Sequence, residues 1–312
     1  MERLAVCAVG GNSLIRSPGR VSFADQYETA QGTARYLADM IQVGWRLIVT
    51  HGNGPQVGFL LIRSHLARSR LPEIPLDVCN ALTQAEIGYM LQLALTNELR
   101  KRGLVHRVVT VVTQVLVDPL DPAFAHPSKP VGPFYTKREA VALERELGWV
   151  LSEDAGRGFR RLVPSPEPQA VLECREIEAL VNAGVVVIAA GGGGIPVVQQ
   201  DGKLYGVAAV IDKDLASGLL AQEIGAELLV ISTSVEKVFV HYNQPEQDAL
   251  DVLSVARARE LLAQGQFPAG SMGPKIEAAI RFLTEGGHKV IITDPPHIIP
   301  ALSGKAGTVL VV

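Results

Sequence analysis

The chain has 312 residues, of which 47% are hydrophobic and 20% are charged, with 29 basic and 32 acidic side chains. This length and apolar fraction predict two lobes or one large α/β domain. The formal net charge of −3, without a basic stripe, argues against nucleic acid as a partner. We expect no membrane partner, because no apolar run approaches the ~20 residues of a membrane-spanning helix and the N-terminal apolar run is too short for a signal peptide. A cytoplasmic location is expected, with free thiols at Cys7, Cys79 and Cys174.

Short apolar, β-branched runs alternate along the chain with amphipathic segments. The runs predict buried strands at 4–9, 46–50, 108–117, 185–190, 228–233, 289–293 and 308–312. The amphipathic segments predict helices near 25–43, 54–68, 80–102, 173–183, 213–224, 254–264 and 274–285. Continuous apolar strands that alternate with helices indicate a mostly parallel sheet covered on both faces.

Residues 118–168 interrupt this alternation. Five prolines fall within 118–135 and three more within 163–168. Between these segments, Thr136 and Glu139 have the spacing of a capping box and predict the start of a short helix. We therefore expect 118–168 to form a small flap subdomain that departs from the main sheet.

Glycine-rich loops follow three of the predicted strands, at 10–12, 51–58 and 191–196. In parallel sheets, ligands bind at the carboxyl ends of strands, and glycine lets backbone N–H groups approach an anion closely. Each loop by itself could equally be a tight turn, but the three together predict a shared anion site. The loops lack the P-loop and dinucleotide-binding fingerprints, and the chain has no nucleophile elbow, which excludes ordinary members of those classes.

Two lysines stand at predicted helix starts, where a cation is usually unfavourable by roughly 0.3–1 kcal/mol. Lys213 opens one helix beside Asp214, which suits the positive helix end and could cap it. Pro274 suits the first position of another helix, which places Lys275 in its first turn. A single such lysine is usually just a solvated side chain. A ligand of dense negative charge, such as a transferring phosphoryl group, would make both positions favourable.

Several long, ungapped motifs are spread over nearly the whole chain. These are AVGGNSL, LIVTHGNGPQVG, LTQAEIGYML, TQVLVDPLDPAF, PSKPVGPF, EDAGRGFRRLVPSPEP, GGGGIPVV, AVIDKDLAS and GSMGPKIEAAIRFL. With these motifs the sequence resembles the amino-acid-kinase superfamily, and within it the carbamate kinases. Relatives that act on other acceptors carry a lysine shortly before the first glycine pair, where this chain has Ala8 and Val9.

The resemblance implies a three-layer αβα sandwich with a mostly parallel central sheet, two lobes and a protruding flap. Residues 1–205 would form the lobe that binds carbamate or carbamoyl phosphate, including the flap at about 118–168, and residues 206–312 the nucleotide-binding lobe. It also implies a homodimer and the reaction ATP + carbamate = ADP + carbamoyl phosphate. Mg²⁺ would be carried by the nucleotide, and the enzyme would make ATP in arginine catabolism by the deiminase pathway.

The resemblance further implies roles for individual residues. Those expected to hold the carbamoyl or phosphoryl end are Gly10, Gly11, Asn12, Gly52, Asn53 and Gly54. Those expected to be catalytic are Lys213 and Lys275, which bracket the phosphoryl group, Lys129, which reaches over from the flap, and Asp214, which orients the lysines or the nucleotide. Those expected to contact the nucleotide are Asp214, Thr233, Tyr242, Met272 and Lys275.

One segment departs from the family pattern. Where relatives often have Thr-Gly-Val-Asp, this chain has Thr233-Ser234-Val235-Glu236, in a segment that borders the expected nucleotide pocket. Two alternative functions follow from the same fold. One is a kinase for another small acceptor, against which the absent first-strand lysine and the flap argue. The other is a non-catalytic nucleotide or metabolite sensor. Such a protein would be free to lose Lys129, Lys213 and Lys275, and the presence of all three argues against it.

Overall fold

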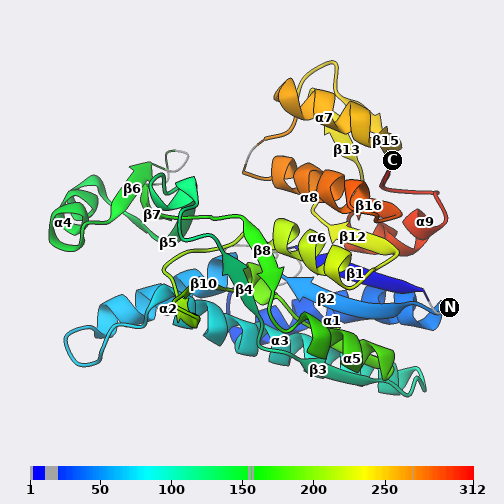
Figure 1. Cartoon of the computed structure of the whole chain (residues 1–312), viewed down its shortest axis with the longest axis horizontal. Coiled ribbons are helices and arrows are strands. Elements are labelled where there is room, and N and C mark those ends of the chain that lie inside the picture. The colour runs from blue at the N-terminus through cyan, green and yellow to red at the C-terminus, as the bar shows by residue number, and fades with distance from the viewer. Residues whose placement is uncertain (1–2, 11–19, 154–155, 157, 269) are drawn as a thin grey trace.

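An eight-stranded sheet forms the centre of the protein (Figure 1), in a computed structural model that describes residues 3–10, 20–153, 156, 158–268 and 270–312. Neighbouring strands in this sheet are parallel, except that β16 and β17 pair antiparallel. The strands lie in the order β15 (Val252–Ser254), β17 (Thr308–Val311), β16 (Lys289–Thr293), β12 (Leu228–Ser232), β1 (Leu4–Val9), β2 (Arg46–His51), β9 (Val185–Ile188) and β3 (Arg107–Thr110).

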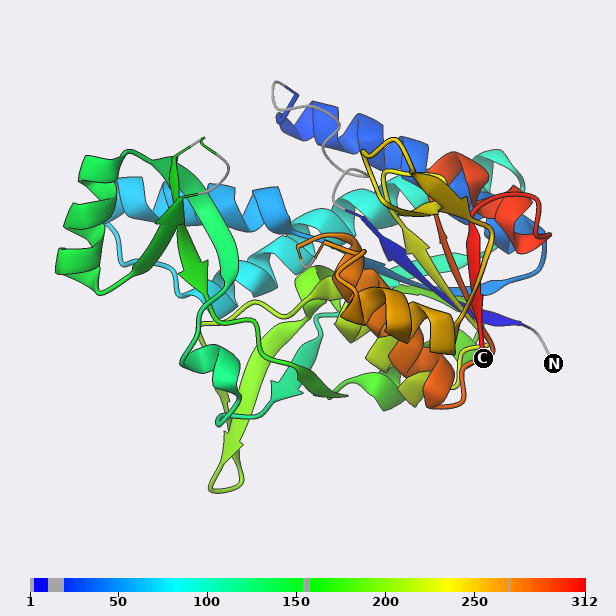
Figure 2. The ribbon, with the colours of Figure 1, turned by 90° about the horizontal axis from the view of Figure 1, so that it is seen from above.

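Helices cover both faces of this sheet (Figures 1 and 2). One face packs against α1 (Phe23–Gln42), α3 (Leu76–Lys101) and α9 (Ile298–Leu302). The other packs against α5 (Cys174–Asn182), α6 (Lys213–Glu223), α7 (Val255–Ala263) and α8 (Met272–Thr284). Successive side chains of a strand point to opposite faces, so in β1 Ala5 and Cys7 join the first core and Val6 joins the second. The predicted three-layer α/β class is confirmed.

One predicted strand, 108–117, is wrong. The chain breaks in its middle, and β3 ends at Thr110 while β4 (Gln114–Val117) begins a second sheet. Thr113 turns the backbone here, because its hydroxyl donates to the carbonyl of Val111 at 2.8 Å and its N–H donates to Oε1 of Gln84 at 2.8 Å. The second sheet contains β11 (Lys203–Gly206), β10 (Ile195–Gln200), β4 and β8 (Pro168–Val171), and a separate hairpin pairs β13 (Val238–Val240) with β14 (Asp248–Leu250).

The described residues between 129 and 163 form a small unit that stands off the main sheet, at the left of Figure 1, and we call it the β5–β7 unit. It contains β5 (Lys129–Tyr135), α4 (Lys137–Leu147), β6 (Val150–Glu153) and β7 (Phe159–Val163), with β7 between β5 and β6. The predicted capping box is confirmed, since the Thr136 hydroxyl accepts the N–H of Glu139 and the Glu139 carboxylate accepts the N–H of Thr136. The unit packs against α2 (Gly54–Ala67).

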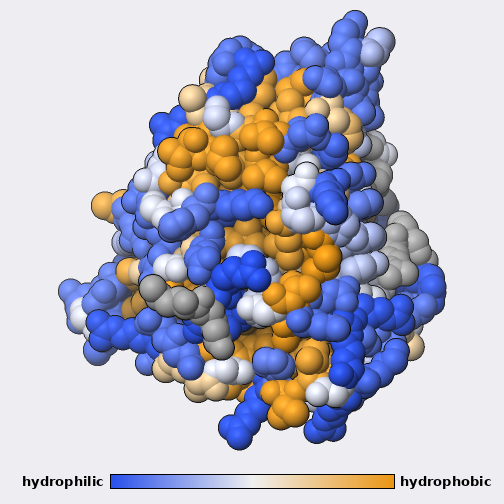
Figure 3. Space-filling model, turned by 90° about the vertical axis from the view of Figure 1, so that its right-hand side faces the viewer, coloured by the Kyte–Doolittle hydropathy of each residue, from blue (hydrophilic) through white to orange (hydrophobic). Residues whose placement is uncertain are grey.

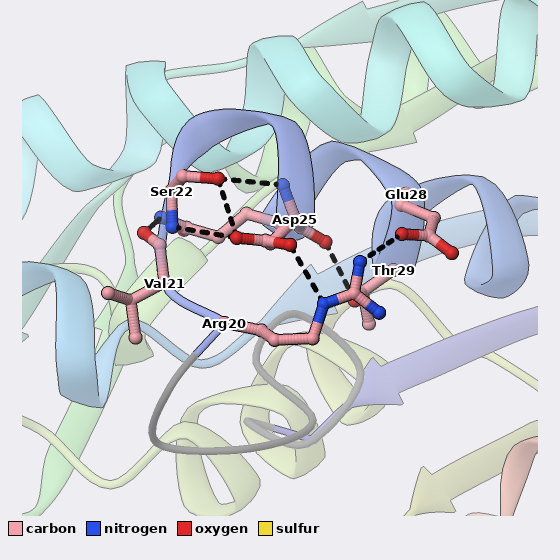
Figure 4. Close-up of polar contacts among 7 residues, drawn as sticks. Arg20, Val21, Ser22, Asp25, Glu28 and Thr29 are labelled. Atoms are coloured by element: carbon pink, nitrogen blue, oxygen red, sulfur yellow. Dashed lines mark hydrogen bonds and ion pairs between the residues drawn. The ribbon is translucent and has the colours of Figure 1, made fainter.

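The start of α1 is fixed by a second capping box (Figure 4). The Ser22 hydroxyl accepts the N–H of Asp25 at 3.2 Å, and the Asp25 carboxylate accepts the N–H of Ser22 at 3.3 Å. Arg20 then bridges Asp25 at 2.9 Å and Glu28 at 2.6 Å. These contacts satisfy N–H groups that the first helical turn leaves unpaired, and they place negative charge at the positive helix end.

The surface away from the β5–β7 unit carries a band of hydrophobic residues between hydrophilic margins (Figure 3). Among the described residues, no helix has both the length and the apolar composition needed to cross a bilayer.

Candidate active site

Two adjoining cavities lie where β1, β2 and β12 end. The larger has a volume of about 460 Å³, and the smaller has a volume of about 140 Å³. The predicted residues that line the larger cavity are Gly10, Gly52, Asn53, Gly54, Lys129, Lys213, Asp214, Thr233 and Lys275. The smaller cavity is lined by the predicted Thr233, Tyr242 and Met272, and both cavities share Thr233, Ser234, Ser271 and Lys275. Gly11 and Asn12 lie outside the described residues.

Asp214 holds the two helix-start lysines together. One carboxylate oxygen lies 2.7 Å from Nζ of Lys213, and the other accepts from Nζ of Lys275 at 2.7 Å. The side chains of Lys213, Asp214 and Lys275 are only 12%, 5% and 14% exposed. Lys213 opens α6, and Lys275 is the fourth residue of α8. Segments 61 residues apart therefore place two ammonium groups on a single carboxylate.

Burial and charge act in opposite directions on these groups. Burial by itself would raise the pKa of Asp214, but Lys213 and Lys275 outweigh it and hold this pKa at about 2. Burial lowers the pKa of Lys213, and Asp214 opposes that shift. An ion pair in such a place is favourable only when its charges stay matched. Two cations on one anion leave an excess of positive charge, which an anionic ligand in the cavity would neutralise.

The cap of α6 differs from the prediction. Asp212, not Asp214, caps the helix, because its Oδ1 accepts the N–H of Asp214 at 2.8 Å. Its Oδ2 accepts from Nζ of Lys129 on β5 at 2.6 Å. Also, α8 begins at Met272, two residues before the predicted Pro274. The Asp214 side chain therefore does not cap α6, and its carboxylate contacts Lys213 and Lys275 instead.

The glycine turn 191–194 contributes Gly192 to the lining of the larger cavity. Ala190, Gly192, Gly193 and Gly194 all have positive φ, which L side chains rarely adopt. A Cβ at Gly192 would lie 2.3 Å from the Asn53 amide, so this turn and the turn after β2 touch directly. Close contact of the two turns requires glycine here.

A buried polar layer supports these turns from α3. Asn53 uses its amide N–H groups to bond Asn80 at 3.2 Å and Thr83 at 2.9 Å. Gln84 donates to the carbonyls of Gly191 and Thr113, each at 3.0 Å. These bonds pair polar groups of four side chains and two backbone carbonyls with one another, as burial demands. The layer fixes the positions of the turns after β2 and β9.

The smaller cavity is mostly apolar, with a few polar groups in its lining. The rings of Phe239 and Tyr242 lie 6.0 Å apart at 41°, and Met272 lines the cavity with them. Thr233 and Ser234 supply hydroxyl groups. An apolar slot with a few polar groups suits a flat heterocycle. Its border with the larger cavity runs past Lys275, so a ligand in the slot could extend anionic groups toward the lysines.

The larger cavity is also lined by Asp212, Ser232 and Ser271, which were not predicted from the sequence. Asp212 could have been predicted as a helix cap, since Asp is common directly before the start of a helix. Ser232, the last residue of β12, could not be predicted. Its position depends on the register between β12 and β16, in which Ser232 pairs with Thr293. In the segment that departs from the family pattern, Ser234 lines both cavities and Glu236 lies 3.9 Å from His297.

Comparison with known proteins defines the class. The chain belongs to the amino acid kinase family, whose model matches residues 3–294.

Its individual relatives are more specific. A carbamate kinase of Pyrococcus furiosus is 46% identical over 99% of both chains. A carbamate kinase-like protein of Escherichia coli is 48% identical, over 99% of this chain and 98% of the relative. Among solved structures, carbamate kinase from Giardia lamblia bound to AMP-PNP is 40% identical, with a TM-score of 0.94, covering 99% of this chain and 98% of that chain.

Proposed function

We propose that this protein is a carbamate kinase, which catalyses ATP + carbamate = ADP + carbamoyl phosphate. The observation that carries the proposal is the pair of buried lysines on Asp214, in a cavity that glycine turns border on one side and an apolar slot joins on the other. The names of the relatives supply the acceptor, carbamate.

The residues would act mainly by position and charge. Phosphoryl transfer needs little covalent help from the protein, and catalysis comes from alignment and from stabilising charge on the transferred group. Lys213 and Lys275 would flank that group, with Lys129 above it, and Asp214 would hold the first two side chains in place. Gly10, Gly52, Asn53 and Gly54 would hold the carbamoyl end.

The lining of the two cavities supports a division of the substrates between two parts of the chain. Residues 1–205 supply the glycine turns and the β5–β7 unit, and we infer that this lobe binds carbamate or carbamoyl phosphate. Residues 206–312 supply Thr233, Tyr242 and Met272, and we infer that they bind the nucleotide. Lys275 lines both cavities, which is where a phosphoryl group passing between substrates would lie.

Magnesium would arrive with the nucleotide. Mg²⁺ in kinases is usually held by substrate phosphates and one or two carboxylates. Asp212 and Asp214 line the larger cavity, and both already contact lysines. Within the described residues, no three His, Cys, Asp or Glu side chains gather as a resident metal site. The donor set thus fits an ion bound chiefly by ADP or ATP, whose charge would aid the lysines.

We further propose a cytoplasmic homodimer that makes ATP during arginine breakdown by the deiminase pathway. The dimer is supported by α3, whose inner face is core while its outer face exposes Val78, Leu82 and Tyr89 at 42%, 42% and 56%. With Ala85, these residues form a helical stripe at i, i+4, i+7 and i+11. A second copy could bury the same stripe by two-fold symmetry.

The test of the proposed function is ATP formation from carbamoyl phosphate and MgADP by the purified protein, coupled to a nucleotide-dependent indicator reaction. Rapid ATP formation is expected. Other small acceptors, such as acetylglutamate, aspartate and UMP, should be assayed beside carbamate in the reverse direction, because a relative of 48% identity is named only carbamate kinase-like. If carbamoyl phosphate is inert and another acceptor is phosphorylated, the substrate assignment is wrong. If nucleotide binds without any transfer, the sensor alternative is favoured.

A further inference from the structure

The carboxylate of Asp212 lies between α6 and the β5–β7 unit. Through Oδ1 it caps α6, and through Oδ2 it accepts from Nζ of Lys129 at 2.6 Å. The Asp212 and Lys129 side chains are 15% and 37% exposed. One side chain thus joins the helix that carries Lys213 and Asp214 to the strand that carries Lys129, 83 positions away in the sequence.

Hydrophobic packing next to this ion pair sets its geometry. Val131 and Val210 belong to one buried cluster, and Val210 donates its backbone N–H to the carbonyl of Pro164 at 3.0 Å. Lys129 and Val131 are two residues apart on β5, so their side chains share a face of the strand. Asp212 follows Val210 by two residues. The ion pair therefore lies next to a packed contact. It differs in this from an ion pair between two fully exposed side chains, which usually contributes little to stability.

Charge explains why the contact is needed. Lys213 and Lys275 already place two ammonium groups in the cavity that Lys129 borders. Like charges repel, so a third ammonium would be pushed outward unless an anion held it. Asp212 supplies that anion. An ammonium group has three N–H donors, so Lys129 can keep its bond to Asp212 and still offer donors to a ligand.

We propose that Asp212 is a positioning residue that holds Lys129, and with it the β5–β7 unit, over the larger cavity. Asp212 acts through Lys129. This inference rests on the proposed function, because it assigns Lys129 to the anionic substrate, carbamoyl phosphate.

The first test does not depend on catalysis. Asp212→Asn keeps an oxygen that can cap α6 but removes the charge that attracts Lys129. Hydrogen–deuterium exchange of the non-proline amides of residues 129–135 in the ligand-free protein should become roughly tenfold faster in Asp212→Asn, and equally in Lys129→Gln. Asp251→Asn is the matched control, because Asp251 also pairs with a lysine, Lys237, away from the cavity. Unchanged exchange in Asp212→Asn would overturn the proposal, whatever the protein catalyses.

The second test measures the effect on the reaction. In Asp212→Asn, KM for carbamoyl phosphate should rise roughly ten- to hundredfold, as for loss of a bond to a charged group, while KM for MgADP stays unchanged. In the Lys129→Gln background, Asp212→Asn should add no further increase, because the two residues act as one unit. Equal effects in both backgrounds would show that Asp212 acts by another route, and the positioning role would be wrong. A wild-type protein inert with carbamoyl phosphate refutes the proposed function instead, and leaves the exchange test to decide on Asp212.

Discussion

Asp214 is the residue on which the electrostatics of the site depend. Its carboxylate is almost fully buried, and a lone buried carboxylate would be costly. Lys213 and Lys275 make it favourable and hold its pKa at about 2. The same contact immobilises both ammonium groups, so they need little rearrangement when charge develops on a ligand.

Removal of either ammonium group should therefore affect turnover strongly. We expect Lys213→Ala and Lys275→Ala each to lower kcat about 10²- to 10³-fold, the usual range for one lost charge contact to a transition state. The coupled ATP assay measures this directly. Lys305→Ala, at an exposed position, serves as the control and should retain full kcat. Near-normal turnover in both site variants would mean that the lysines do not flank the transferred group.

A pH effect is expected at His51, which lies buried behind the turn after β2. Burial lowers its pKa from 6.5 to about 4, although the Gly52 carbonyl partly opposes the shift. The unfolded chain binds a proton at this residue below pH 6.5 and the folded protein does not. The free energy of unfolding therefore falls as pH drops from about 6.5 to 4, by up to about 3 kcal/mol.

Urea unfolding at a series of pH values between 7 and 4 tests this. His51→Gln should flatten the dependence, whereas His126→Gln, at an exposed position, should preserve it. An unchanged slope in His51→Gln would assign the acid sensitivity to other groups.

At the scale of elements, the turn 191–194 connects β9 to β10 and touches the segment that enters α6. Gly193 has φ +92°, and a Cβ there would lie 2.3 Å from the carbonyl oxygen of Ile211, directly before Asp212. A side chain at Gly193 would thus move the start of the helix that carries Lys213 and Asp214. The glycine turn contributes to the lysine site by contact with this segment.

We expect Gly193→Ala to reduce both thermal stability and kcat. Strain at positive φ alone costs roughly 1–2 kcal/mol for alanine, and the backbone clash adds to it. Gly202→Ala is the matched control, because Gly202 also has positive φ, +74°, but open space around it. Thermal unfolding and the coupled assay should separate the two variants. If both lose the same stability and both keep kcat, the Gly193 contact with Ile211 has no influence on the site.

Long periodic elements could be predicted from the sequence, because their patterns report which face is buried. Helix α1 was expected at 25–43 and spans Phe23–Gln42, and strand β16 was expected at 289–293 and spans Lys289–Thr293. The break at Thr113 could not be predicted, because the apolar pattern continues across it and the turn is fixed by Gln84, 29 residues earlier. Likewise, the lysine pattern pointed to an anion site, but the sharing of Asp214 by both lysines depends on how α6 and α8 pack.

At the scale of the whole molecule, α3 links the site to the outer surface. Its inner face carries Asn80, Thr83 and Gln84, which hold the turns around the larger cavity. Its outer face carries the exposed apolar stripe of Val78, Leu82, Ala85 and Tyr89. A helix of 26 residues that is apolar on both sides is expected to be covered on both sides. Association of two chains through α3 would therefore also stiffen the helix that supports the acceptor end of the site.

The double variant Leu82→Glu/Tyr89→Glu should consequently separate the proposed dimer. Two negative charges on each stripe would face their copies across a two-fold axis, where like charges repel and lose water. Light scattering after size-exclusion chromatography should report a mass that falls from two chains to one. Leu120→Glu, at a leucine that is 86% exposed away from the stripe, should leave the mass at two chains.

A wild-type protein already at the mass of one chain, or a double variant that remains at two, would place the stripe outside any dimer interface. If the monomer forms and its KM for carbamoyl phosphate rises while that for MgADP does not, the support from α3 to the glycine turns depends on the partner.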